Sequence, residues 1–221
     1  MVQECTVKLA RCRAALPLCA ALATLMLGGC QVAYLLFGQG RQAAAFKLPK
    51  DVRVLVLVDA APNSGMPISL PRRLGRRIAV RLFHHKVETD FVPQYRVMAL
   101  RRAVPAFAHW SIAKVARKFD TNLVIYVFVR HFTVQLASDN QVTDGAATAE
   151  VKVVSADGQR LWPVRPPGEH PVTAVVRSGL ARDQSVSQVR SHLLTVLARR
   201  TSQLFYSYEI RSQPRMPHPQ K

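Results

Sequence analysis

Five arginines fall within ten residues of the chain, at spacings that would place them on one side of a helix. They are Arg72, Arg73, Arg76, Arg77 and Arg81. No aspartate or glutamate occurs between residues 60 and 87, so no neighbouring acid neutralises them. Like charges four residues apart on a helix cost about 0.2–0.5 kcal/mol per pair. An ordinary solvated helix face is the first interpretation, and a surface that binds anionic groups is the competing hypothesis.

A cysteine preceded by a leucine and two glycines indicates a second chemistry, covalent lipid attachment. Basic residues at positions 8, 11 and 13 precede an uncharged apolar run from residue 14 to residue 27, which is the order of an export signal. Leu27-Gly28-Gly29-Cys30 resembles the lipobox of bacterial lipoproteins. The resemblance implies cleavage between Gly29 and Cys30. It also implies a diacylglycerol on the Cys30 sulfur, usually with a third acyl chain on its amine. Residues 1–29 would then be a signal peptide.

An uncleaved membrane span is the alternative for this segment, because about 20 apolar residues suffice to cross a bilayer. Cysteine usage favours the lipoprotein. Three of the four cysteines, Cys5, Cys12 and Cys19, would leave with the signal, and acylated Cys30 would leave the mature chain without a free thiol. Gln31 resembles the residue after the cysteine in lipoproteins sorted to an outer membrane. We therefore expect a lipid-anchored protein of the cell envelope, at the outer membrane and facing the periplasm.

Charge supports an anionic partner. The mature chain would keep 28 basic and 12 acidic residues, a net charge of +16, which favours phosphates, lipid headgroups or acidic polysaccharide. The alternative is base composition, because arginine outnumbers lysine 23 to 8. An exported location argues against nucleic acid as the partner.

Catalytic and metal-binding patterns are not found. The sequence contains no GxSxG elbow, no phosphate-binding glycine loop and no histidine at metal-ligand spacing with a second ligand. His84 and His85 are adjacent and would point to different sides of a helix. We interpret Asp59, in a loop over residues 59–71, as a turn or cap residue. The sequence therefore predicts a protein that is not an enzyme and has no cofactor.

The first half of the mature chain alternates strands and helices. Residues 30–50 are interpreted as a lipidated tether, and the uninterrupted apolar run 52–58 predicts a central strand buried on both faces. Apolar residues at four-residue steps predict a helix over 70–85. A short strand at 87–91 and a short helix at 97–104 follow, then a second helix capped by Ser111.

The second half predicts an antiparallel arrangement. Residues 122–136 form the longest strand, residues 138–145 turn the chain, and residues 146–154 return beside it. Asp157-Gly158 predicts a tight hairpin leading to residues 161–162. Residues 172–176 supply an edge strand, residues 185–208 a long helix, and residues 211–221 a disordered tail. The fold class is mixed α/β, with an α+β character. About five strands have a parallel start and an antiparallel finish, and three to four helices pack on them in one domain, residues 51–210.

A family resemblance rests on two segments, the strand 122–129 and VVSADGQRLW with its Asp157-Gly158 turn. They resemble the small α/β domain of bacterial envelope lipoproteins, including the CsgG type of curli secretion, transport-auxiliary lipoproteins and the N-terminal domain of TolB. The resemblance covers residues 51–208. The chain departs from the pore-forming members of this group, because it has no evident pair of long alternating hairpins, and we therefore do not expect a pore.

Two functions remain open. The first is a non-enzymatic, lipid-anchored assembly, scaffolding or transport-auxiliary partner that binds an envelope protein or a second copy of itself. The alternative is a binding module for an anionic lipid or acidic glycan that uses the five arginines.

Overall fold

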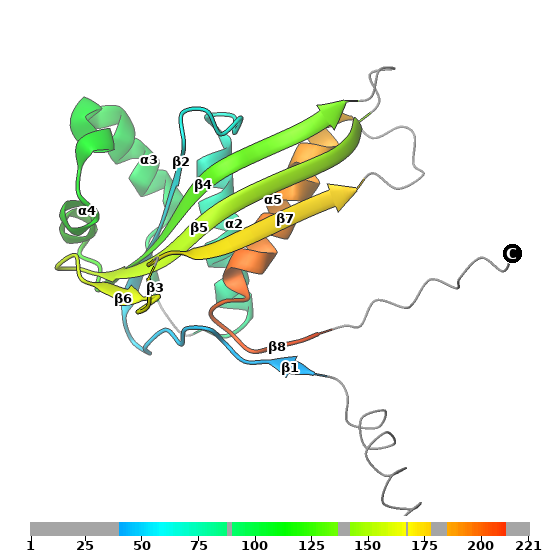
Figure 1. The fold of residues 1–221 in the computed structure, drawn as a ribbon. Helices are drawn as coiled ribbons and strands as arrows, with labels where there is room; N and C mark the ends of the chain where they lie inside the picture. The colour runs from blue at the N-terminus through cyan, green and yellow to red at the C-terminus, as the bar shows by residue number, and fades with distance from the viewer. Residues whose placement is uncertain (1–39, 88–89, 137–141, 167, 178–184, 211–221) are drawn as a thin grey trace, which may run out of the picture. The chain divides into compact units, whose positions relative to one another are not determined.

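Two parallel strands, β2 (Arg53–Ala60) and β4 (Leu123–Leu136), run through the middle of the fold in the computed structural model (Figure 1). The structure describes residues 40–87, 90–136, 142–166, 168–177 and 185–210. All five residues from Val54 to Val58 are buried, as an apolar run with no alternation predicts. β2 lies between β4 and the short strand β3 (Asp90–Phe91), so its predicted central position is confirmed.

The other half of the sheet is antiparallel. β4 pairs with β5 (Val142–Ser155), and β5 pairs in turn with β6 (Arg160–Trp162) and β7 (His170–Arg177). The sheet thus has six strands with the predicted parallel start and antiparallel finish. At β7, Arg200 Nη1 donates a hydrogen bond to Thr173 O at 2.7 Å.

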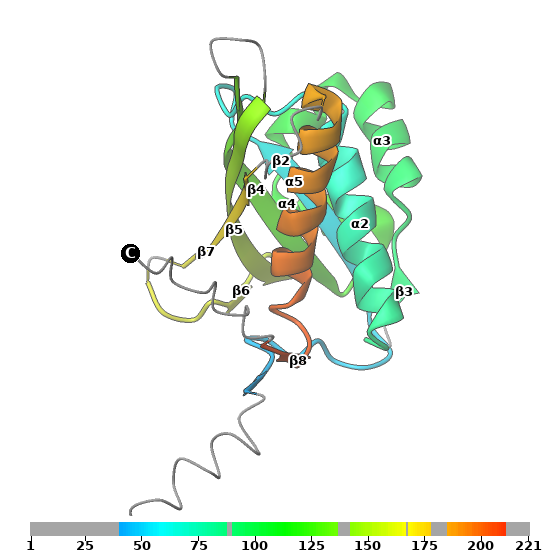
Figure 2. The same cartoon turned by 90° about the vertical axis from the view of Figure 1, so that its right-hand side faces the viewer.

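Helices cover both faces of this sheet. Helices α2 (Leu70–His84) and α5 (Val186–Ser202) lie side by side on one face (Figure 2). The other face, near β2, packs against three shorter elements: α3 (Gln94–Ala103), the 3-10 helix η1 (Pro105–His109) and α4 (Ile112–Phe119). Ser111 caps α4 as predicted, accepting a hydrogen bond from Lys114 N at 3.2 Å.

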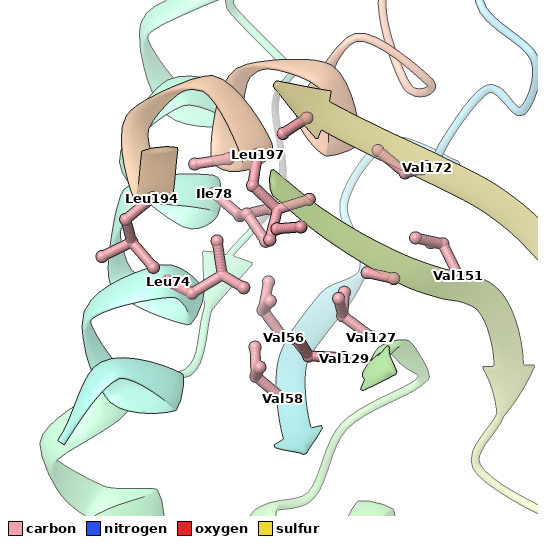
Figure 3. Close-up of a cluster of buried hydrophobic side chains, with 14 of the residues drawn as sticks. Val56, Val58, Leu74, Ile78, Val127, Val129, Val151, Val172, Leu194 and Leu197 are labelled. Carbon is pink, nitrogen blue, oxygen red and sulfur yellow. The ribbon is translucent and has the colours of Figure 1, made fainter. Parts of the chain in front are cut away.

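Successive residues of β2 enter two different cores. Val56 and Val58 face α2 and α5, where Leu74, Ile78 and Leu197 pack against them (Figure 3). Leu55 and Leu57 enter the second core with side chains of α3, η1 and α4. A fully buried aliphatic side chain contributes about 1.5–3 kcal/mol relative to exposure, so both helical layers stabilise the sheet.

Among the predicted boundaries, two differ most from the structure. The turn predicted over 138–145 ends earlier, because β5 already begins at Val142. Gly145 lies within that strand, where a Cβ would stand 3.3 Å from Val189 Cγ1, so the glycine allows α5 to approach the sheet closely.

The last helix is the second error. It begins as predicted, at a capping box between Ser185 and Gln188, but ends at Ser202 and not at residue 208. Phe205 and Tyr206 are buried beyond its end, and Leu204 O accepts a hydrogen bond from Phe46 N at 3.0 Å. The chain therefore turns back toward the core, which a straight helix would not allow.

The chain divides into two compact units. Residues 43–208 form the unit described so far. Residues 40–42 and 209–210 belong to the other unit, where Ile210 N donates a hydrogen bond to Gly40 O at 2.9 Å. The strands β1 (Arg41–Gln42) and β8 (Tyr208–Glu209) form a two-stranded sheet. The predicted signal peptide, Cys30 and the tail 211–221 lie outside the described residues. Among the described helices, none is both long and apolar enough to cross a membrane.

Candidate anion-binding groove

The inward side of α2 determines where its arginines lie. Leu70, Leu74, Ile78 and Leu82 recur at four-residue steps and are all buried, so this stripe fixes the rotation of the helix against the sheet. The residues between them are turned toward solvent or toward α5. The predicted basic face is therefore on the outside of the two-helix layer.

A groove of about 690 Å³ runs along this surface, and we call it the arginine groove. Most of its lining residues come from α2, while His85 directly follows α2 and Thr195 comes from α5. The lining residues are Arg73, Arg76, Arg77, Val80, Arg81, His84, His85 and Thr195. The structure thus brings four of the five predicted arginines together, whereas Arg72 is exposed outside the groove. No carboxylate is among the lining residues.

Arg77 has a structural role that its neighbours lack. Its Nη1 donates to Ser191 O at 2.7 Å and to Thr195 Oγ1 at 2.6 Å, and its Nη2 donates to Ser191 Oγ at 3.1 Å. Burial lowers the pKa of Arg77, and the positive charges of Arg73 and Arg81 lower that pKa further. Three cationic side chains therefore stand close enough to repel one another.

The two histidines both line the groove, although adjacent residues of a regular helix would point apart. His84 is the last residue of α2, and His85 follows it with its ring stacked on Tyr206 at a centroid distance of 3.8 Å. Burial lowers the pKa of His85, with further contributions from Arg81 and His84. Within the described residues, no three histidine, cysteine, aspartate or glutamate side chains are grouped to hold a metal ion.

The ion pairs of the described residues lie elsewhere. Asp90 pairs with Arg53, and Asp59 with Arg101. Glu150 pairs with Arg130 at 2.7 Å, and Glu169 pairs with Lys152 at 2.9 Å. Within this part of the chain, no ion pair joins an α2 arginine to a carboxylate.

A second pocket, of about 520 Å³, lies at the carboxyl end of β2, beside Tyr126 and Phe128 in the first half of β4. Its walls include Phe107, Trp110, Tyr126 and Phe128, and Asp59 and Arg101 are its charged groups. Ligands of open α/β sheets often bind at such strand ends. This pocket could not be predicted from the sequence, because its walls come from segments far apart in the chain.

Asp59 was predicted to be a turn or cap residue, and this is wrong. It lies in β2, where Arg101 Nη2 approaches Asp59 Oδ1 to 2.5 Å. The pKa of Tyr126 is raised well above its ordinary value. Burial is the largest cause of that shift, followed by the negative charge of Asp59 and the hydrogen bond to it. Asp59 of β2 therefore interacts with Arg101 of α3 and with Tyr126 in the aromatic wall of the pocket.

Comparison with known proteins gives similar folds at low identity. No protein-family model and no curated protein matches the chain. Among solved structures, a PelC dodecamer from Paraburkholderia phytofirmans is 12% identical with a TM-score of 0.43, and the match covers 75% of this chain and 97% of that one. Lipoprotein GNA1162 from Neisseria meningitidis is 14% identical with a TM-score of 0.43, over 67% and 96% of the two chains.

A third similar structure is the C-terminal domain of LpoB from Salmonella enterica. It is 13% identical with a TM-score of 0.36, and the match covers 59% of this chain and 85% of that one. All three TM-scores are below 0.5, so these likenesses carry no argument about function. The resemblance to CsgG-type, transport-auxiliary and TolB domains stays a prediction.

Proposed function

We propose that the protein is a lipid-anchored, non-enzymatic component of the cell envelope whose arginine groove binds anionic groups. One observation carries the proposal: four arginines line one groove that contains no carboxylate. The carboxylates of Asp59, Asp90, Glu150 and Glu169 are paired with other cations. The groove is thus an electropositive surface for which the described residues provide no counterion.

Arginine suits this role because its planar guanidinium donates two parallel hydrogen bonds to phosphate, sulfate or carboxylate oxygens. The contacts with α5 hold Arg77 in place, whereas Arg73 and Arg76 are exposed and available to a ligand. The lining supplies donors and charge but no nucleophile beside a base, so it supports binding and not catalysis.

Calorimetric titration of the full-length protein in neutral detergent with pyrophosphate tests the groove. We expect binding at low salt that is lost near 1 M NaCl, where the Debye length falls to about 3 Å. Changing Arg73 and Arg76 together to Gln should abolish it. The matched control changes Arg96 and Arg102, two exposed arginines of α3, to Gln. If both double variants lose pyrophosphate binding equally, the binding depends on the net charge of the protein and not on the arginine groove.

His85 provides a local readout of the same titration. The positive charge of Arg81 contributes to its lowered pKa, so an anion bound beside Arg81 should raise the His85 pKa. NMR of the His85 ring through a pH series with and without pyrophosphate measures this shift. An unchanged His85 pKa at saturating pyrophosphate would place the anion outside the groove.

The anchor requires a separate experiment. Cells labelled with radioactive palmitate should incorporate it into the protein, and Cys30→Ala should abolish both incorporation and membrane retention. Labelling that survives Cys30→Ala would refute the predicted lipidation.

The assembly role stays the second candidate. Among the described residues, Ile68, Tyr95 and Val164 are large apolar side chains that are exposed, and a partner could cover them. Crosslinking in cells followed by mass spectrometry tests this role. Recovery of monomer alone would argue against both an envelope partner and a homo-oligomer.

A further inference from the structure

We propose that the anion bound by the arginine groove is the headgroup layer of a membrane, and that Phe83 and Val80 enter that layer between the arginines. This inference rests on the proposed anion binding and names its partner. The domain would lie with the outer surface of α2 against an anionic bilayer.

Two exposed apolar side chains on α2 are the first observation. The side chain of Phe83 is 71% exposed and that of Val80 is 44% exposed. Arg76, Val80 and Phe83 follow one another at steps of four and three residues, so they share one side of the helix. A soluble phosphate would bind the arginines and leave Phe83 in water, whereas a bilayer surface would accommodate both kinds of side chain.

The charge of the adjoining helix extends this surface. α5 lies beside α2 in the same layer (Figure 2). His192 and Arg199 of α5 are exposed. Neither helix, α2 at residues 70–84 nor α5 at residues 186–202, contains an aspartate or glutamate. The charge on both helices is therefore exclusively positive, which complements anionic lipid.

The mixture of residues favours a membrane over a protein partner. The buried centres of protein interfaces are depleted in charged residues. Here two apolar side chains stand among several arginines, with no extended apolar area between them. Interfacial segments of peripheral proteins combine basic residues at the headgroups with aromatic and aliphatic side chains that enter about 5–10 Å.

Fluorescence of the full-length protein reconstituted in vesicles tests the inference. The Phe83→Trp variant places a reporter on α2, and Tyr95→Trp is the matched control because Tyr95 on α3 is 68% exposed. Spectra of the parent, with its two native tryptophans, are subtracted. The vesicles contain phosphatidylcholine alone, or equal parts of phosphatidylcholine and phosphatidylglycerol, with bromine on the acyl chains.

We expect the Phe83→Trp signal to shift to shorter wavelength and to be quenched by brominated lipid in the phosphatidylglycerol vesicles only. High salt should reverse both effects, and the Tyr95→Trp signal should not change. Equal quenching at both positions, or none at position 83, would overturn the inference. A shift to shorter wavelength without quenching would also overturn it, because a protein would then cover Phe83.

Two further variants separate this inference from the proposed function. Changing Arg73 and Arg76 to Gln in the Phe83→Trp background should abolish the quenching, as it abolishes pyrophosphate binding. Phe83→Ser should leave pyrophosphate binding intact and weaken the contact of α2 with the vesicle surface. Less efficient energy transfer from the two native tryptophans to a dansyl-labelled lipid would measure this change. If pyrophosphate binds but vesicles cause no quenching, anion binding by the arginine groove stands and the membrane as its partner is refuted. Loss of both would refute the two proposals together.

Discussion

Arg77 and Ser191 are 114 residues apart in the chain, yet Arg77 Nη1 lies 2.7 Å from Ser191 O. The same guanidinium also reaches the hydroxyl groups of Ser191 and Thr195. One member of the basic stripe therefore joins α2 to α5, while Arg73 and Arg76 beside it remain exposed. The stripe combines a structural residue with residues available to a ligand.

The first prediction separates these two roles. Arg77→Ala should lower the free energy of unfolding by about 1–3 kcal/mol, because partly buried groups of α5 lose their charged partner. Arg73→Ala should change it by no more than about 0.5 kcal/mol, as is usual for exposed positions. Urea unfolding followed by circular dichroism measures both. Equal effects of the two substitutions would contradict the structural role of Arg77.

A second prediction concerns the ionisation of Tyr126. In an alkaline titration followed by tyrosinate absorbance, Tyr126 should lose its proton well above the ordinary range, because burial and Asp59 raise its pKa. Tyr126→Phe should remove the late phase and Tyr95→Phe should leave it. Asp59→Asn should shift the late phase to lower pH, because it removes a negative charge that opposes ionisation.

The same shift has a consequence for stability. Folded Tyr126 holds its proton more tightly than the unfolded chain does, so its contribution is fully present below the unfolded pKa of about 10. That contribution is lost as pH rises further, toward the folded pKa. Urea unfolding at pH 8 and near pH 11 should therefore show a smaller loss of stability for Tyr126→Phe than for the parent. An equal loss would contradict the assignment.

The third prediction tests the last helix. Leu193, Leu194 and Leu197 are fully buried, and Leu→Ala in a core costs about 2–5 kcal/mol. A chain that ends at Asp183 should therefore be insoluble or sensitive to protease, whereas a chain that ends at Ser212 should resist proteolysis like the parent. Limited proteolysis of both chains, made without the signal and Cys30, gives the comparison. A stable Asp183 truncation would mean that α5 is not part of the core.

A fourth prediction uses the close approach of α5 to β5. Gly145→Val should destabilise the fold by about 1–3 kcal/mol, because its side chain would meet Val189 and Leu193. Ala146→Val, at the exposed neighbouring position, should have little effect or a slightly favourable one. Thermal unfolding of the pair decides the point, and equal melting temperatures would contradict the packing of α5 on β5.

Elements with local signals could be predicted from sequence. The start of α5 follows from Ser185 and Gln188, which cap it reciprocally within four residues. α2 follows from apolar residues at four-residue steps, and β2 from an apolar run buried on both faces. These patterns depend on neighbours in the sequence, so they are visible without the fold.

Features set by distant contacts could not be predicted. α5 ends early because Phe205 and Tyr206 turn into the core. No proline or glycine near Ser202 indicates this end in the sequence. Arg72 and Arg73 are adjacent in sequence, yet only Arg73 lines the groove. Asp59 lies in β2 and not in the predicted loop, and it interacts with Arg101 and Tyr126, which lie on other elements. The site was therefore predictable as a set of charges but not as a shape.

The contribution of Thr195 to the arginine groove also has a consequence during synthesis. The ribosome delivers α2 long before α5, so a nascent chain carries all five arginines while the groove does not yet exist. An interrupted or prematurely terminated product keeps the positive charge but lacks the wall that α5 supplies. The complete groove is therefore present only once α5 has been synthesised and packed beside α2.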